Sequence, residues 1–177
     1  ELGANHAGEI DYLTQLARPT VGIVTNAGPA HLEGFGSLEG VARAKGELFA
    51  GLDAQAIAII NADDVFAPLW RELAGDRKVL SFGMQINADV RATYTVLTQG
   101  TELQMQTPQG HVELLLSLPG RHNVLNALGA TAAALAAESD LAGMGRAYRK
   151  WALANPGLYR VATTRPLDRE NLPEGAT

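Results

Sequence analysis

The sequence has 177 residues, 46% apolar and 19% charged, which is the composition of a globular protein with one sizeable core. No apolar run reaches the roughly 18 residues of a membrane-spanning helix, and the first residues lack the features of a signal peptide. We therefore expect a cytoplasmic protein without membrane contact. The chain has no cysteine, so any bound metal would have oxygen or imidazole ligands, which favours Mg²⁺ or a similar hard ion.

Charge is unevenly distributed along the chain. Residues 1–140 carry 8 Lys and Arg against 16 Asp and Glu, net −8, whereas residues 141–177 carry 6 against 3, net +3, which together give −5. The acidic first part argues against nucleic-acid binding. The asymmetry predicts a main domain over 1–140 and a tail of unrelated character over 141–177, in which a short helix is expected at 147–153.

The first half of the chain alternates between strand-like and helix-like patterns. Residues 21–26 (V-G-I-V-T-N) and 57–61 (I-A-I-I-N) are short apolar runs that predict buried parallel strands. Residues 37–49 lie between them with helical spacing and with Ser37 as a candidate N-cap. A further helix near 65–73 and a strand near 78–82 would repeat the unit, with right-handed crossovers.

A different pattern follows from residue 90. Three β-like runs are separated by Gln99-Gly100 and by Pro108-Gln109-Gly110, which predicts an antiparallel meander. They cover residues 91–98, 102–107 and 111–117. An alanine-rich helix is expected at 123–137, packed closely on the sheet. The fold class is therefore α/β, a mostly parallel sheet flanked by helices with a small antiparallel subsheet.

Glu1, His31 and Lys45 form the first candidate constellation. They lie at or beyond the ends of predicted strands, or on the helix that follows, where α/β sheets form their ligand crevice. Taken singly, a histidine in such a loop is more often structural and a helix lysine is more often a solvated charge.

Four separated motifs occur in the order found in the Mur ligases, and the resemblance covers about residues 1–137. They are E-L-G-A-N-H-A-G-E-I (1–10), A-G-P-A-H-L-E-G-F-G-S-L-E-G-V-A-R-A-K-G-E-L-F (27–49), N-A-D-D (61–64) and P-G-R-H-N-V-L-N-A (119–127). The chain resembles the central, ATP-binding domain of that family, in incomplete form.

The resemblance implies a metal-centred site. By match to the family, Glu1 and His31 are the candidate ligands of a magnesium ion. Lys45, fourteen residues after His31, resembles the lysine that family members carbamylate with CO₂. A carbamate converts a cation into an anion, which can hold metal beside a phosphate.

The resemblance also implies contacts to substrate and nucleotide. Asn5 and His6 match the approach to the peptide substrate, although Asn5 could equally stabilise a turn. Asn123 and Asn126 match the adenine-contacting segment, where amides donate and accept at the purine edge. The alternative for Asn123 is an N-cap of the alanine-rich helix. Asp63 either orients the site through hydrogen bonds or caps a helix.

Mur ligases use ATP and Mg²⁺ to convert a carboxylate into an acyl phosphate, from which an amine displaces phosphate to form an amide. Within the family, the resemblance points to addition of D-alanyl-D-alanine to UDP-N-acetylmuramoyl-tripeptide, a step of peptidoglycan precursor synthesis. The sequence contains no G-x-x-x-x-G-K-[ST] loop. We therefore expect a ligase fragment that is inactive, or nearly so, on its own.

A second resemblance lies in the tail. Residues 147–160 (A-Y-R-K-W-A-L-A-N-P-G-L-Y-R) are similar to a piece of the ligand-binding domain of TetR-type repressors. Two alternatives to the ligase interpretation follow: a non-catalytic truncated or chimeric protein, or a fragment of a ligand-sensing transcriptional regulator. The regulator would need a DNA-binding module, which the sequence does not contain.

Deletion of residues 141–177 tests the predicted boundary. Because the tail is expected to pack poorly on the main domain, its removal should leave the melting temperature of the remainder nearly unchanged in a calorimetric scan. A drop of more than about 8 °C, equivalent to more than roughly 2 kcal/mol for a domain of this size, would show that the tail is integral.

Overall fold

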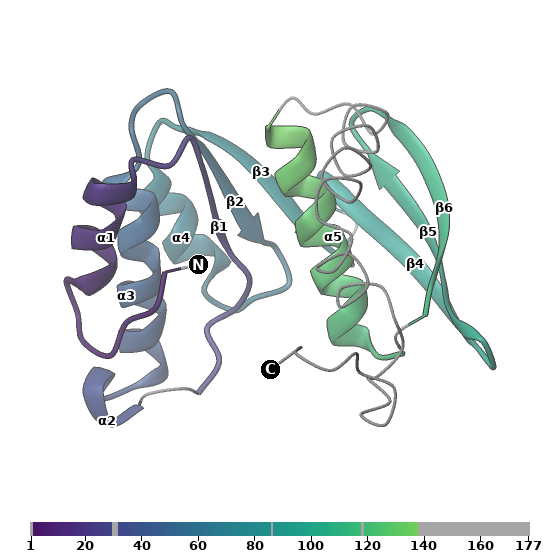
Figure 1. Cartoon of the computed structure of the whole chain (residues 1–177), viewed down its shortest axis with the longest axis horizontal. Coiled ribbons are helices and arrows are strands. Elements are labelled where there is room, and N and C mark those ends of the chain that lie inside the picture. The colour runs from purple at the N-terminus through teal and green to yellow at the C-terminus, as the bar shows by residue number, and fades with distance from the viewer. Residues whose placement is uncertain (1, 30–31, 86, 118, 138–177) are drawn as a thin grey trace, which may run out of the picture. The chain divides into compact units, whose positions relative to one another are not determined.

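The structure is a computed structural model and describes residues 2–29, 32–85, 87–117 and 119–137 (Figure 1). The chain divides into two compact units, residues 1–138 and 139–177, and the description concerns the first unit. The helix predicted at 147–153 and the rest of the tail lie outside the described residues. Within the described part, no helix is long and apolar enough to cross a membrane.

Six strands form one sheet in the order β1-β2-β3-β4-β5-β6. Strands β1 to β4 are parallel, whereas β4, β5 and β6 are antiparallel. The strands are β1 Val21–Val24, β2 Ile57–Asn61, β3 Lys78–Gly83, β4 Val90–Leu97, β5 Gly100–Thr107 and β6 Gly110–Leu116. The predicted mostly parallel sheet with an antiparallel subsheet is confirmed.

The predicted strand-helix-strand unit is present at β1 and β2. The two strands pair in parallel, with Val21 opposite Ile57, and helix α3 (Leu38–Gly51) connects them. Ser37 is the N-cap of α3, because its hydroxyl accepts a hydrogen bond from the Gly40 amide at 3.0 Å. That bond satisfies one of the amides that a helix start leaves without an intrahelical partner.

Helices cover both faces of the parallel strands (Figure 1). In β2, Ala58 and Ile60 belong to the core under α1 (Glu9–Ala17), α3 and α4 (Ala67–Ala74). Ile59, on the opposite face, packs in a second core with α5 (Arg121–Ala136). Coverage of both faces explains why β2 reads as a continuous apolar run instead of an alternating one.

The antiparallel strands have one covered face and one solvated face. Ala92, Leu103 and Met105 are buried on the side of α5. Their neighbours along β5, Gln104 and Gln106, are exposed on the other side. This alternation is typical of an antiparallel sheet with a single buried face. The meander itself was predicted from the turn residues between the three β-like runs.

Helix α5 approaches the sheet closely because its residues are small. A methyl group at Gly129 would lie 3.3 Å from side-chain atoms of both Ile23 and Phe82. The helix begins at Arg121, with Gly120 at the N-cap position, two residues before the predicted start. The interpretation of Asn123 as the N-cap is therefore wrong, since Asn123 already lies inside the first turn.

Two helices were not predicted. Helix α1 follows Gly8, and its first turn is held by Glu47 of α3, which accepts hydrogen bonds from the Gly8 amide at 2.7 Å and the Asp11 amide at 3.2 Å. Helix α2 (Leu32–Phe35) has four residues. A capping partner 36 to 39 residues away leaves no local signal in the sequence.

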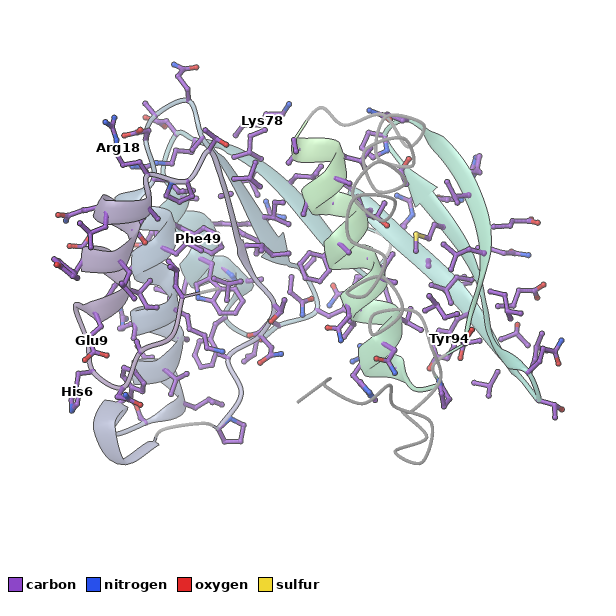
Figure 2. All side chains as sticks on the ribbon, in the orientation of Figure 1. His6, Glu9, Arg18, Phe49, Lys78 and Tyr94 are labelled. Atoms are coloured by element: carbon purple, nitrogen blue, oxygen red, sulfur yellow. The ribbon has the colours of Figure 1, made fainter. Side chains whose placement is uncertain are left out.

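Trp70 fixes the packing of α4 against α3. Its side chain is fully buried, and its indole N–H donates to the Ala42 carbonyl at 2.9 Å. The ring meets Phe49 edge to face, with centroids 6.4 Å apart. Figure 2 shows Phe49 between its helix and the strands. Gly46 leaves room for this contact, because a Cβ there would lie 3.2 Å from the indole and 2.4 Å from Leu73.

Replacement of Trp70 by Ala should lower the free energy of unfolding by about 3–5 kcal/mol, through lost apolar burial and the cavity that remains. Trp70→Phe should cost less, on the order of 1–2 kcal/mol, since it keeps an aromatic ring and loses the hydrogen bond. Urea unfolding followed by circular dichroism measures both. The exposed Val65→Ala is the control and should stay within about 0.5 kcal/mol of the parent; a Trp70→Ala effect that small would contradict the packing role.

Candidate functional site

Polar side chains gather where β1, β2 and β3 end. Asn61, the last residue of β2, is 4% exposed and donates from its amide to the Thr25 carbonyl at 2.7 Å. Its amide oxygen accepts from the Asp63 backbone N–H at 2.9 Å. Asn61 thus joins the loop after β1 to the turn after β2. This edge is where parallel α/β sheets bind ligands.

Asp64 makes a second link to the loop after β1. One carboxylate oxygen accepts from the Ala27 amide at 3.0 Å, and the other accepts from the Phe66 amide at 2.9 Å, just before α4. The loop that follows β1 is consequently held from β2 at two points, Thr25 and Ala27. Neither bond depends on side chains of the loop itself, so the loop's own side chains are left for other contacts.

Asp63 turns away from α4 and toward β3 and α5. Its carboxylate accepts hydrogen bonds from the Met84 amide at 3.0 and 3.1 Å, and from the Gln85 amide at 3.2 Å. The Arg121 guanidinium donates to it at 2.9 Å. The N-cap position of α4 is Phe66 instead. Of the two roles considered for Asp63, helix capping is therefore wrong.

Lys45 projects from α3 to the end of β1. Its ammonium donates to the Asn26 carbonyl at 2.8 Å. The side chain is half-buried and lines a hollow of about 580 Å³ along β1, which Leu2 and Ile10 also line. Lys45 and Leu2 meet again in a smaller hollow of about 60 Å³. The residue after Glu1 therefore lies on the same part of the surface as Lys45.

The segment that contains Asn5 and His6 is held by Glu9. Its carboxylate accepts from the Asn5 amide at 2.7 Å and the His6 amide at 3.2 Å, and one oxygen lies 3.3 Å from the His6 ring nitrogen. Figure 2 shows His6 and Glu9 together at the start of α1. The Asn5 amide, then the His6 amide and ring, lower the pKa of Glu9.

The same segment packs tightly on α2. The Asn5 carbonyl oxygen would lie 2.1 Å from a Cβ at Gly34, so only glycine permits this approach. Both alternatives for Asn5 stay open, because its backbone stabilises the turn while its side chain is exposed. His6 is exposed as well, with 72% of its side chain accessible.

Asn123 and Asn126 lie in the first two turns of α5. The Asn123 amide donates to the Pro119 carbonyl at 2.8 Å, which fixes its orientation. Asn126 is exposed. Arg121, at the start of the helix, is tied to Asp63, so the turn after β2 and the start of α5 are joined directly.

Residues 61–64 therefore connect the loop after β1, which Lys45 contacts at Asn26, to the start of α5, the helix that carries Asn123 and Asn126. Glu1 and His31 lie outside the described residues. Among the described residues, no three His, Asp or Glu side chains are arranged to hold a metal ion. Sequence reasoning did not single out Asn61, Asp64 or Arg121. Asn61 ends a buried strand and Asp64 follows it closely, and polar residues at that position were the available signal.

Comparison with known proteins identifies the family. Residues 1–134 match the model of the Mur ligase middle domain. The UDP-N-acetylmuramoyl-tripeptide--D-alanyl-D-alanine ligase of Escherichia coli K12 is 50% identical over 143 residues, covering 80% of this chain and 32% of the ligase. The ligase of the same name from Haemophilus influenzae is 42% identical over 135 residues, covering 76% and 29%.

Solved structures agree with this result. A crystal structure of MurF from Acinetobacter baumannii matches with a TM-score of 0.76 at 42% identity, covering 81% of this chain and 31% of that protein. The Thermotoga maritima MurF ligase in complex with ADP matches with a TM-score of 0.71 at 25% identity, covering 79% and 33%. The chain spans about a third of the length of the curated relatives that it matches. Because the family model covers residues 1–134 and the fold agrees with solved relatives, the chain belongs to the Mur ligase middle-domain family.

Proposed function

We propose that this chain is the nucleotide-binding part of an ATP-dependent amide ligase. The ligase adds D-alanyl-D-alanine to UDP-N-acetylmuramoyl-tripeptide. The observation that carries the proposal is the connected edge of the sheet, where residues 61–64 join the loop near Lys45 to the start of α5. The names of the relatives and the ADP complex of the Thermotoga relative support it.

The nucleotide base is assigned to α5. Asn126 is exposed, so its amide is available to a purine edge, to which it can both donate and accept. Asn123 has one amide hydrogen committed to Pro119, which orients its carbonyl oxygen as an acceptor. The Asp63–Arg121 pair holds the turn from which both asparagines project.

The phosphate and metal end is assigned to Lys45, with Glu1 and His31 as metal ligands. Magnesium prefers oxygen ligands and, when bound, neutralises charge on a transferring phosphoryl group. Lys45 can contribute an oxygen ligand beside Glu1 and His31 only if it is carbamylated, since its ammonium cannot ligate a cation. The Lys45 ammonium would first lose a proton; the resulting amine would attack the carbon of CO₂ and release a second proton, which gives a carbamate beside the Asn26 carbonyl.

The carboxylate of the peptide substrate, which reacts with ATP, is assigned to the part of the site next to Asn5 and His6. Their segment is held in place, since Glu9 accepts hydrogen bonds from two of its amides and Gly34 admits its backbone. A segment held in this way can position a peptide with less loss of conformational entropy. The amine would then displace phosphate from the acyl phosphate. The residues of this chain would bind and orient the substrates at the carboxyl edge of the sheet.

Asn126→Ala should weaken ADP binding to the 177-residue chain on the order of tenfold, because the base loses its hydrogen-bonding partner. Isothermal titration calorimetry in the presence of Mg²⁺ measures the affinity. Gln104→Ala, which removes an exposed amide from the solvated face of β5, is the matched control and should bind ADP like the parent. Equal affinities of the Asn126 variant and the parent would reject the assignment of the base to α5.

Carbamylation of Lys45 is tested with ¹³C-labelled bicarbonate. The parent chain should give a carbamate carbon resonance that disappears in Lys45→Ala. Lys78→Ala is the control, because Lys78 is an exposed lysine at the start of β3 and its removal should leave the resonance unchanged. A parent without the resonance, or a Lys45→Ala variant that retains it, would show that Lys45 is not the modified residue.

A further inference from the structure

Asp63 is the most connected acidic side chain of the described part. It is only 7% exposed, and its partners come from the loop after β3 and from α5, 21 to 22 and 58 residues further along the chain. A buried carboxylate is stable only when hydrogen bonds replace the water that it loses. Two backbone amides and one guanidinium provide those bonds here.

The surrounding backbone is shaped to admit this carboxylate. A Cβ at Gly83 would lie 2.6 Å from a carboxylate oxygen of Asp63 and 3.1 Å from its carboxyl carbon. Only glycine at the end of β3 allows the side chain to lie this close to Met84 and Gln85. The contact is therefore specific in shape as well as in charge.

The contact also joins the start of α5 to the turn after β2. Gly120, at the N-cap position, has no side chain with which to cap the helix, and the Asp63–Arg121 bond is what joins the first helical residue to the parallel strands. The rest of α5 packs on the sheet through the fully buried Val124 and Leu128 and through small residues such as Ala132. The ion pair adds a directional, charge-assisted contact at the solvent-exposed start of the helix, where this apolar packing does not reach.

We propose that Asp63 is a positioning residue for the nucleotide site: it holds the first turn of α5, and hence Asn123 and Asn126, in a fixed orientation against the loop after β3. The inference rests on the proposed function, because it takes those asparagines as the contacts to the base. Asp63 itself touches no nucleotide in this arrangement. Its effect passes through Arg121 and through the amides of Met84 and Gln85.

Asp63→Asn is the direct test, since it keeps the shape and removes the charge. The remaining carbonyl oxygen can still accept from the Met84 and Gln85 amides, but more weakly than a carboxylate, and the new NH₂ group is a donor that cannot accept from Arg121, so the start of α5 is released. ADP affinity, measured by calorimetry on the 177-residue chain, should fall on the order of tenfold. Asp76→Asn makes the same charge change at an exposed position and should bind like the parent.

Two further variants separate positioning from general destabilisation. Leu52→Ala removes a buried side chain from the core under α1, α3 and α4, on the opposite face of the sheet from α5, and it should lower stability but leave ADP affinity within about twofold of the parent. Arg121→Gln should match Asp63→Asn, and the double variant should be no weaker than either single variant, because both break one contact. Independent, additive losses, or an equal loss in Leu52→Ala, would overturn the proposal.

A measurement without ligand keeps the two proposals distinguishable. In NMR spectra of the free chain, Asp63→Asn should speed hydrogen exchange at the Met84 and Gln85 amides. It should also shift the resonances of residues 121–126, including both side-chain amides. Asp76→Asn should change neither. If the parent fails to bind ADP, the assignment of the nucleotide site fails; if the resonances of α5 are unmoved in Asp63→Asn, the positioning role fails.

Discussion

Polar side chains buried at the end of β2 must find hydrogen-bond partners, and that requirement organises the rest of the sheet edge. Asn61 and Asp64 satisfy it with the loop after β1, and Asp63 satisfies it with the loop after β3 and with α5. One turn of four residues thereby sets the positions of three separate segments. Without those partners, burying the carboxylate would destabilise the fold by more than the surrounding packing stabilises it.

The parallel part of the fold could be predicted because its signals are local. The apolar run of β2, the helical spacing of α3 and the hydroxyl of Ser37 all lie within the elements that they specify. Helix α1 could not be predicted in the same way, because its first turn depends on Glu47, far along the chain. The start of α5 was misplaced since Gly120, and not an asparagine, precedes it.

The candidate site was predictable in part, and by resemblance more than by pattern. Lys45 was singled out from its motif, and the structure brings it to the end of β1, beside Asn26. The partners of Asp63 could not be foreseen, because an aspartate after a strand can cap the next helix or accept from distant amides. Sequence spacing does not distinguish these two roles. The positions of Gly83 and Arg121 in the structure do, because both lie against the Asp63 carboxylate.

The two outermost strands differ in a way that bears on self-association. In the described part of the sheet, β1 and β6 each pair on one side only, so both present backbone groups that another strand could join. β6 carries His111 and Glu113, polar side chains that discourage such pairing, whereas β1 is V-G-I-V, without a charge. The short length of β1 limits how many hydrogen bonds an added strand could gain. At β1 that short length is therefore the protection against edge pairing, and a single lysine at its margin would add the charge that this strand lacks.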